Sequence, residues 1–164
     1  MTDSLADGNT RVAYVVAIAA QAAPSAATEL NAGSSILLQS LITPDGLIGF
    51  EADTADVPTG ALNSTFNTVD LGRDSVQGTM LRLKKQTTGD TAYTTLGVRG
   101  TTGFIVIRRS VPETTAWAAG QAVEVYPIKT GRKRRLAPEE NSVEKYEIPL
   151  KIYIVPSFDA VVAA

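Results

Sequence analysis

The chain has 164 residues, with 15 Lys and Arg against 17 Asp and Glu, so its formal net charge is −2. It contains no His and no Cys, which excludes imidazole bases, thiol nucleophiles, disulfides and the usual zinc ligands. The length predicts a single domain (1–164) with one core, and the acidic balance argues against a freestanding nucleic-acid-binding protein.

The N-terminal segment 12–26, VAYVVAIAAQAAPSA, has the apolar core and small residues of a secretory signal. However, Asp3 and Asp7 precede it against a single Arg11, where a signal peptide needs net positive charge. The apolar run is also too short to span a membrane. We therefore predict no membrane association, synthesis in the cytoplasm, and a strand at 12–18 that is covered on both faces.

Most later segments have the patterns of strands, which we expect at 36–42, 61–69, 75–84, 103–109, 121–128 and 144–155. The second and third of these are joined by the turn-like DLGRD and are expected to pair antiparallel. In the last strand, one face carries Tyr146, Ile148, Leu150, Ile152 and Ile154, and the opposite face carries Lys145, Glu147 and Lys151. Pro149 lacks an amide donor, so this strand is predicted to be an edge strand or to be bulged there.

Two short helices are predicted. The first is a single turn at 28–33 capped by Thr28, and the second covers 90–96, with Asp90 as N-cap and Gly97 as the stop. The expected fold class is mainly β: a β-sandwich or barrel of two antiparallel sheets with one short flanking α-helix.

Segment 43–60, TPDGLIGFEADTADVPTG, has little periodicity and is expected to form a long loop. It contains three large apolar residues, Leu47, Ile48 and Phe50, which a solvated loop would rarely expose together. Two interpretations remain open: the loop folds back and plugs the end of the sandwich, or it docks on another copy of the chain.

The strands predicted at 61–69 and 75–84 have small, polar faces that neither build a core nor carry much charge. The residues on these faces are Ala61, Asn63, Thr65, Asn67, Gln77 and Thr79. Such faces suit a hydrated wall, and copies joined edge to edge would close a large barrel with such a lining. Rings joined by a heterologous contact would then extend into a filament. Asn63, Thr65, Asn67, Gln77 and Thr79 are the candidate lumen-facing residues.

Without His and Cys, candidate catalytic groups are limited to carboxylates, Lys, Ser and Tyr, and paired carboxylates occur, such as Asp53 with Asp56 and Glu139 with Glu140. They lie in segments rich in Pro, Thr and Gly, and no spacing marks them as an acid and a base. We therefore predict that the chain is not an enzyme and carries no cofactor and no metal.

The order of segments resembles the major tail tube proteins of long-tailed (siphovirus-type) bacteriophages, particularly those of actinobacteria. The segments that carry the resemblance are VAYVVAIA, TELNAGS, LITPDGL, TMLRLKKQT, DTAY, GTTGFIVIRRS, AAGQAVEVYPIKTGRKR and YEIPLKIYIVPSFDAVVAA. They cover nearly all of the chain, although this family has no short catalytic motif.

The resemblance implies a structural subunit that forms hexameric rings, which stack into a tube around a tape-measure protein. Tail terminator and tip proteins would complete the virion tail, and DNA would pass through the lumen without specific binding. Segment 43–60 would then be the long loop that contacts the neighbouring ring, through Leu47, Ile48, Phe50, Glu51, Asp53 and Asp56. No added immunoglobulin-like domain is expected after Ala164.

The basic run Arg132, Lys133, Arg134 and Arg135 stands out because the rest of the chain has 11 basic against 17 acidic residues. A basic tube wall would hold DNA through many ion pairs, so we place the run away from the bore. It is predicted to contact an acidic surface of an adjacent subunit, such as that around Glu51, from a hairpin turning at Thr130-Gly131. For the run itself, the alternative is a solvated hairpin. For the function of the chain, the alternatives are a tube protein of a cellular injection system or gene-transfer particle, and a β-sandwich binding module that uses 129–135.

Overall fold

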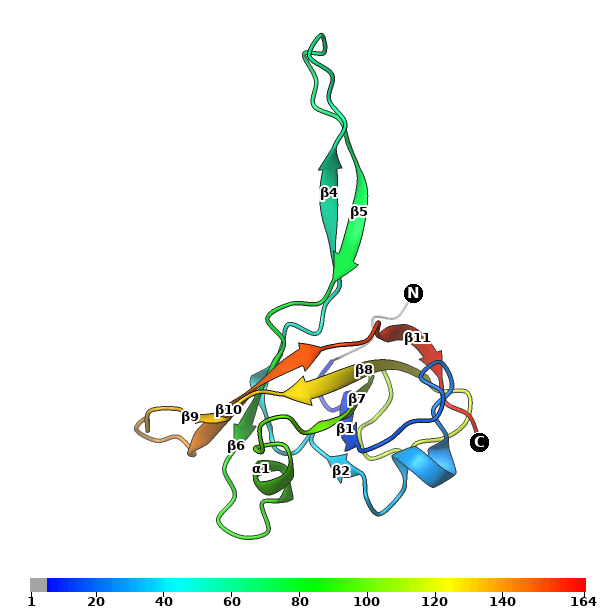
Figure 1. Ribbon diagram of the computed structural model, residues 1–164. Helices are drawn as coiled ribbons and strands as arrows, with labels where there is room; N and C mark the ends of the chain where they lie inside the picture. Colours follow the sequence, from blue (N-terminus) through cyan, green and yellow to red (C-terminus); the bar gives the residue numbers. More distant parts are fainter. Residues whose placement is uncertain (1–5) are drawn as a thin grey trace.

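The structure is a computed structural model that describes residues 6–164, and antiparallel strands dominate it (Figure 1). The strands are β1 (Arg11–Val15), β2 (Ile36–Leu37), β3 (Ile42–Ile48), β4 (Asp53–Pro58), β5 (Val69–Ser75), β6 (Met80–Lys84), β7 (Thr102–Arg108), β8 (Ala122–Thr130), β9 (Arg134–Arg135), β10 (Lys145–Ile152) and β11 (Ser157–Val161). The main sheet has the order β2-β1-β7-β8-β10-β6-β3, with β11 beside β8 and β9 beside β10, and β4 pairs with β5 in a second sheet. The predicted mainly β fold is confirmed.

The main sheet curls and buries side chains on both faces. In β1, Val12 and Tyr14 join the larger core cluster, whereas Ala13 and Val15 join a smaller cluster on the other face. The predicted strand covered on both faces is therefore confirmed, although it ends at Val15. β7 and β8 continue both clusters, because alternate residues of an extended chain point to opposite faces.

Two short helices flank the sheet. In α1 (Thr91–Thr95), the Asp90 side chain accepts a hydrogen bond from the Tyr93 amide at 3.0 Å, so the predicted N-cap is confirmed. The other is a single π-helical turn, η1 (Ala26–Leu30). Its cap is Ser25, whose hydroxyl accepts from the Thr28 amide at 3.3 Å, and not Thr28 as predicted.

Segment 43–60 is not a long loop, which corrects the sequence-based expectation. Its first part belongs to β3, which pairs with β6, and its last part contains β4. Phe50 is buried against Tyr126, with ring centroids 5.1 Å apart, and the Tyr126 hydroxyl donates to the Phe50 carbonyl at 3.0 Å. Leu47 also packs on the larger core, and Ile48 is half-buried. Leu47 and Phe50 thus contribute to the subunit's own core, as the plug interpretation expects.

The predicted pairing of 61–69 with 75–84 is wrong, because β5 pairs with β4 and β6 lies between β3 and β10. Asn63, Thr65 and Asn67 lie in the connection between β4 and β5, and Gln77 and Thr79 lie between β5 and β6. The five candidate lumen residues therefore do not share a strand face. Segment 61–69 alternates in polarity, but it has too few large apolar residues to form a strand that packs on the core.

β10 is an interior strand whose register with β6 runs regularly from Lys145 to Pro149, which lies opposite Met80, so the predicted edge position or bulge of this strand is wrong. The partner segment from Thr130 to Arg135 contains one more residue than the stretch Tyr146 to Leu150 that it faces. β8 and β9 both pair with β10, so Thr130-Gly131 is not a hairpin turn, and the chain reverses in 136–144 instead. β10 ends at Ile152, which leaves Ile154 exposed rather than in the core.

The contrast between two phenylalanines tests this fold. Phe50 is 3% exposed and Phe66 is 73% exposed. Phe50→Ala should lower the free energy of unfolding by about 3–5 kcal/mol, because it leaves a cavity in the core. Phe66→Ala should change it by less than about 0.5 kcal/mol. Urea unfolding of the dilute, unassembled chain measures both, and equal losses would contradict the assignment of core and surface.

Candidate functional site

A β-hairpin projects far from the rest of the molecule (Figure 1). We call residues 53–75, that is β4, β5 and their connection, the hairpin arm. Its two strands pair through contacts such as Val57 opposite Asp70, and Thr59 and Thr68 continue the ladder with an amide-to-carbonyl bond of 2.8 Å. All of the arm is exposed except Gly72 and Ser75, which are half-buried. The arm therefore has no core of its own.

The arm exposes large apolar side chains, namely Val57, Leu62, Phe66, Val69 and Leu71. Leu62 and Leu71 are exposed by 106% and 81%, which leaves almost no contact with the rest of the chain. Soluble proteins expose single apolar residues freely, but a group on one projecting element marks an interaction surface. These residues were missed in the sequence, where the turn-rich stretch PTGALNS between two short extended segments is the signal that predicts a hairpin.

The root of the arm is held by close backbone packing. Gly49 has φ +71°, and a Cβ there would lie 2.7 Å from the carbonyl carbon of Gly78. Only glycine combines that conformation with so close an approach. The Thr79 hydroxyl then donates to the Gly49 carbonyl at 3.1 Å. Together with buried Phe50, these contacts set the direction in which the arm leaves the sheet.

The arm is acidic. It carries Asp53, Asp56, Asp70 and Asp74 against Arg73, and Glu51 precedes it. None of these carboxylates has a cationic nitrogen within 4.0 Å among residues 6–164. Two of the predicted contact residues, Asp53 and Asp56, therefore lie on the arm, whereas Leu47, Ile48 and Phe50 do not.

At the other end of the molecule, cations gather around Tyr93 of α1. The Lys133 ammonium lies 3.5 Å from the ring centroid and the Lys85 ammonium 4.6 Å. Arg135 donates to the Tyr93 hydroxyl at 3.3 and 3.4 Å. Hydrogen bonding from Arg135, aided by the charge of Lys133, holds the pKa of Tyr93 below its usual value. We call Tyr93, Lys85, Lys133 and Arg135 the Tyr93 cluster; its contacts are cation–π interactions and charged hydrogen bonds.

The basic run is only partly free. Lys133 and Arg135 belong to the Tyr93 cluster, and Arg134 pairs with Glu147 at 2.7 Å. Arg132 is exposed. In the described part of the chain, Arg132, Lys133 and Arg135 have no carboxylate oxygen within 4.0 Å. The run therefore offers three cations without acidic partners, and its contact with a neighbouring subunit stays a prediction.

Glu147, which the strand pattern placed on the face opposite Tyr146 and Ile148, is buried. It lies between Arg82 at 2.9 Å and Arg134 at 2.7 Å, and Arg82 also binds Asp45. Burial alone would raise the pKa of Glu147, but the hydrogen bonds from Arg82 and Arg134 outweigh it and lower the pKa below its ordinary value.

The Glu147 contacts predict a pH dependence. A carboxyl group whose pKa is lowered by folding stabilises the native state above its unfolded pKa of about 4.3. That stabilisation is lost as the pH falls through the lower folded value. Glu147→Gln should therefore reduce the free energy of unfolding at pH 7 by about 1–2 kcal/mol. It should also flatten the loss of stability below about pH 4.3, leaving the part due to Asp90, Asp45 and Glu139, whose pKa values are lowered too.

Urea unfolding from pH 7 to pH 2 measures this dependence for the parent and the Gln variant. A variant whose curve runs parallel to that of the parent would show that Glu147 is not the group concerned.

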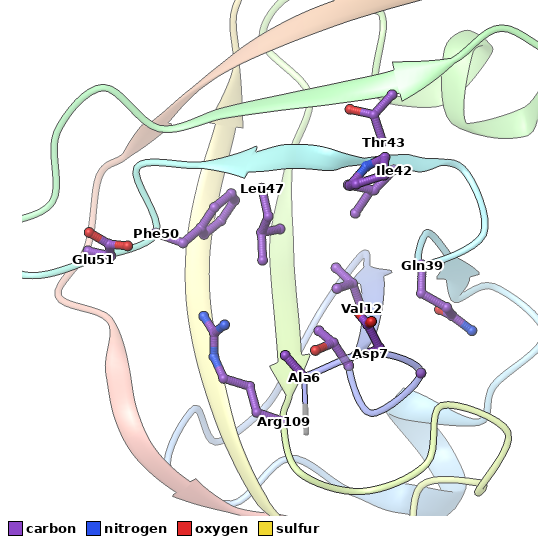
Figure 2. A pocket seen from close by; sticks show the side chains of 13 residues that line it. Ala6, Asp7, Val12, Gln39, Ile42, Thr43, Leu47, Phe50, Glu51 and Arg109 are labelled. Carbon is purple, nitrogen blue, oxygen red and sulfur yellow. The ribbon is translucent and has the colours of Figure 1, made fainter. Parts of the chain in front are cut away.

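The cavity in Figure 2 does not resemble a catalytic centre. It encloses about 470 Å³ between the N-terminal segment and β3, and its charged lining residues are Asp7, Glu51 and Arg109. Arg109 is held by Glu124 at 2.9 Å. Within residues 6–164, no group of three acidic side chains could hold a metal ion, and no helix is long and apolar enough to cross a membrane. The projecting arm is the more informative feature.

Comparison with known families decides between the classes that the sequence left open. A family profile described as "Phage tail tube protein" matches residues 1–164. The chain belongs to the phage tail tube protein family. No curated protein matches the sequence. The resemblance to tail tube proteins is thus confirmed and places the chain among structural proteins of the virion tail, while an actinobacterial host stays a prediction.

Proposed function

We propose that this tail tube protein assembles as hexameric rings that stack into a tube, and that the hairpin arm carries the contact between stacked rings. The tube would surround a tape-measure protein, end on terminator and tip proteins, and later conduct DNA without binding it specifically. In this role the chain is a structural subunit made in the host cytoplasm and performs no catalysis.

The observation that carries the proposal is the arm itself. It extends beyond the body and exposes Leu62, Phe66 and Leu71, which gain no burial within the subunit. Burying one such side chain fully stabilises a contact by roughly 1.5–3 kcal/mol. A ring presents the same arm from every subunit, so a modest contact per arm becomes a strong contact per ring. The arm is therefore suited to joining copies rather than to stabilising one.

The acidic surface also agrees with a conduit. DNA is held by proteins mainly through Lys and Arg contacts to phosphates, each favoured by counterion release. In this chain the basic run is local, because the residues outside it comprise 11 basic against 17 acidic side chains. We therefore expect no specific DNA affinity from this run.

Removing the exposed apolar side chains of the arm tests the proposal. Leu62→Ser, Phe66→Ser and Leu71→Ser together should abolish tubes, because the stacking contact loses its buried surface. The unfolding temperature of the unassembled subunit should stay unchanged, since these side chains are exposed there. Electron microscopy measures tube length, and calorimetry measures unfolding.

The matched control is Val161→Ser, which removes an exposed apolar side chain from β11 and should leave the tubes intact. Tubes of normal length from the triple arm variant would refute the role of the arm. A lower unfolding temperature of the same variant would instead indicate that the arm packs within the subunit.

A further inference from the structure

The end of the molecule opposite the arm contains a groove between β2 and α1 (Figure 1). We call it the β2–α1 groove. It has a volume of about 650 Å³, and its apolar lining comes from Tyr14, Val16, Ile36 and Leu37. Val16 and Leu37 are exposed by 55% and 40%. β2 is an edge strand that pairs only with β1 among the described residues, so the groove is open to an incoming chain segment.

The Tyr93 cluster lies across α1 from this groove. Thr91 and Thr95 line the groove, whereas Tyr93, between them in the same helix, contacts Lys133 and Arg135. Residues two apart on a helix do not face each other. The cations therefore lie about one helix width, roughly 10 Å, beyond the groove.

From its tip inward, the arm presents an apolar surface first and charged groups second, which matches the apolar groove and the cations beyond it. Leu62 and Phe66 are at the tip, and Asp56 and Asp70 follow on the two strands. The apolar tip thus comes first, and the carboxylates lie behind it. The acidic arm and the cations that lack acidic partners are complementary in charge, and a charge match of this kind selects and orients a partner.

We propose that the arm tip of one copy docks in the β2–α1 groove of a copy in the adjacent ring, with Asp56 and Asp70 facing Arg132, Lys133 and Arg135. This inference rests on the proposed stacking of rings and names the surface that receives the arm. Donor and acceptor are different surfaces at opposite ends of the subunit (Figure 1). Such a heterologous contact repeats without closing and extends a tube at one fixed polarity.

A second apolar cavity fits the arm less well. It has a volume of about 360 Å³ at the base of the arm, lined by residues that include Val76, Tyr153 and Val155. Its charged lining residue is Asp74, which would repel an acidic arm. This cavity also lies beside the root of the arm. An arm that docked there would join two copies through the same end of each subunit.

Crosslinking tests the docking directly, because the chain has no cysteine and every introduced thiol is unique. One variant carries Thr65→Cys at the arm tip and Ser34→Cys in the groove. The matched variant carries Thr65→Cys and Val155→Cys, which probes the second cavity. Assembled tubes are treated with a short bis-maleimide and analysed on a denaturing gel. The first variant should give a ladder of multimers, and the second should give no product larger than a dimer.

The arm tip lies at the end of the molecule opposite β2 and α1 (Figure 1), and a ladder of multimers can form only by joining copies. Thr65→Cys alone should give no product larger than a dimer. Thr91→Cys provides a second position in the groove in case Ser34→Cys impairs folding. Arg132→Glu should reduce the ladder several-fold at low salt, whereas Arg132→Lys should preserve it.

The outcomes separate this inference from the function on which it rests. Tubes that crosslink only through Val155→Cys, or through neither position, would overturn docking in the groove and leave the proposed tube intact. A chain without cysteines that forms no rings or tubes would overturn the proposed function instead. An unchanged ladder with Arg132→Glu would refute the charge contact.

Discussion

The root of the hairpin arm is the constraint on which the architecture depends. There, the backbones of Gly49 and Gly78 approach closely while Phe50 packs against Tyr126. This closes the larger core under β3 and β6 and directs β4 and β5 away from it. The large apolar side chains of the hairpin arm have no access to the core, so they can be buried only by another molecule. An isolated two-stranded hairpin is at best marginally stable in water, which makes a partner surface all the more useful to it.

Part of the charge of the chain is separated in space, although the total of basic and acidic residues nearly cancels. Acidic residues lie along the arm, and cations gather at the end formed by α1 and β9. Within that end, Tyr93 and Glu147 hold three residues of the basic run at set positions. Long cationic side chains lose conformational entropy when they are immobilised. Cations already held by their own subunit lose less of it on binding an acidic partner.

Periodicity predicted the elements that pack on both faces of the sheet, such as β1, β7 and β10, and a capping residue predicted α1. It failed for 43–69, because Leu47 and Phe50 have the same apolar signal as Leu62 and Phe66. Which pair enters the core depends on the pairing of β3 with β6, a contact between segments more than thirty residues apart. The burial of Glu147 was not predicted for a related reason: Arg82 and Arg134 make it tolerable, and they belong to other strands, 65 and 13 residues away in the sequence. The cationic run was visible in the sequence, but its contacts with Tyr93 were not.

Hydrogen exchange of the arm amides, compared between dilute subunits and assembled tubes, tests most directly that the arm functions only between copies. In dilute subunits, the amides of β4 and β5 should exchange rapidly, since only each other's strand protects them. In tubes they should become strongly protected, while β7 and β8, already within the sheet core, should change little. Arm amides that exchange equally fast in both states would contradict the account.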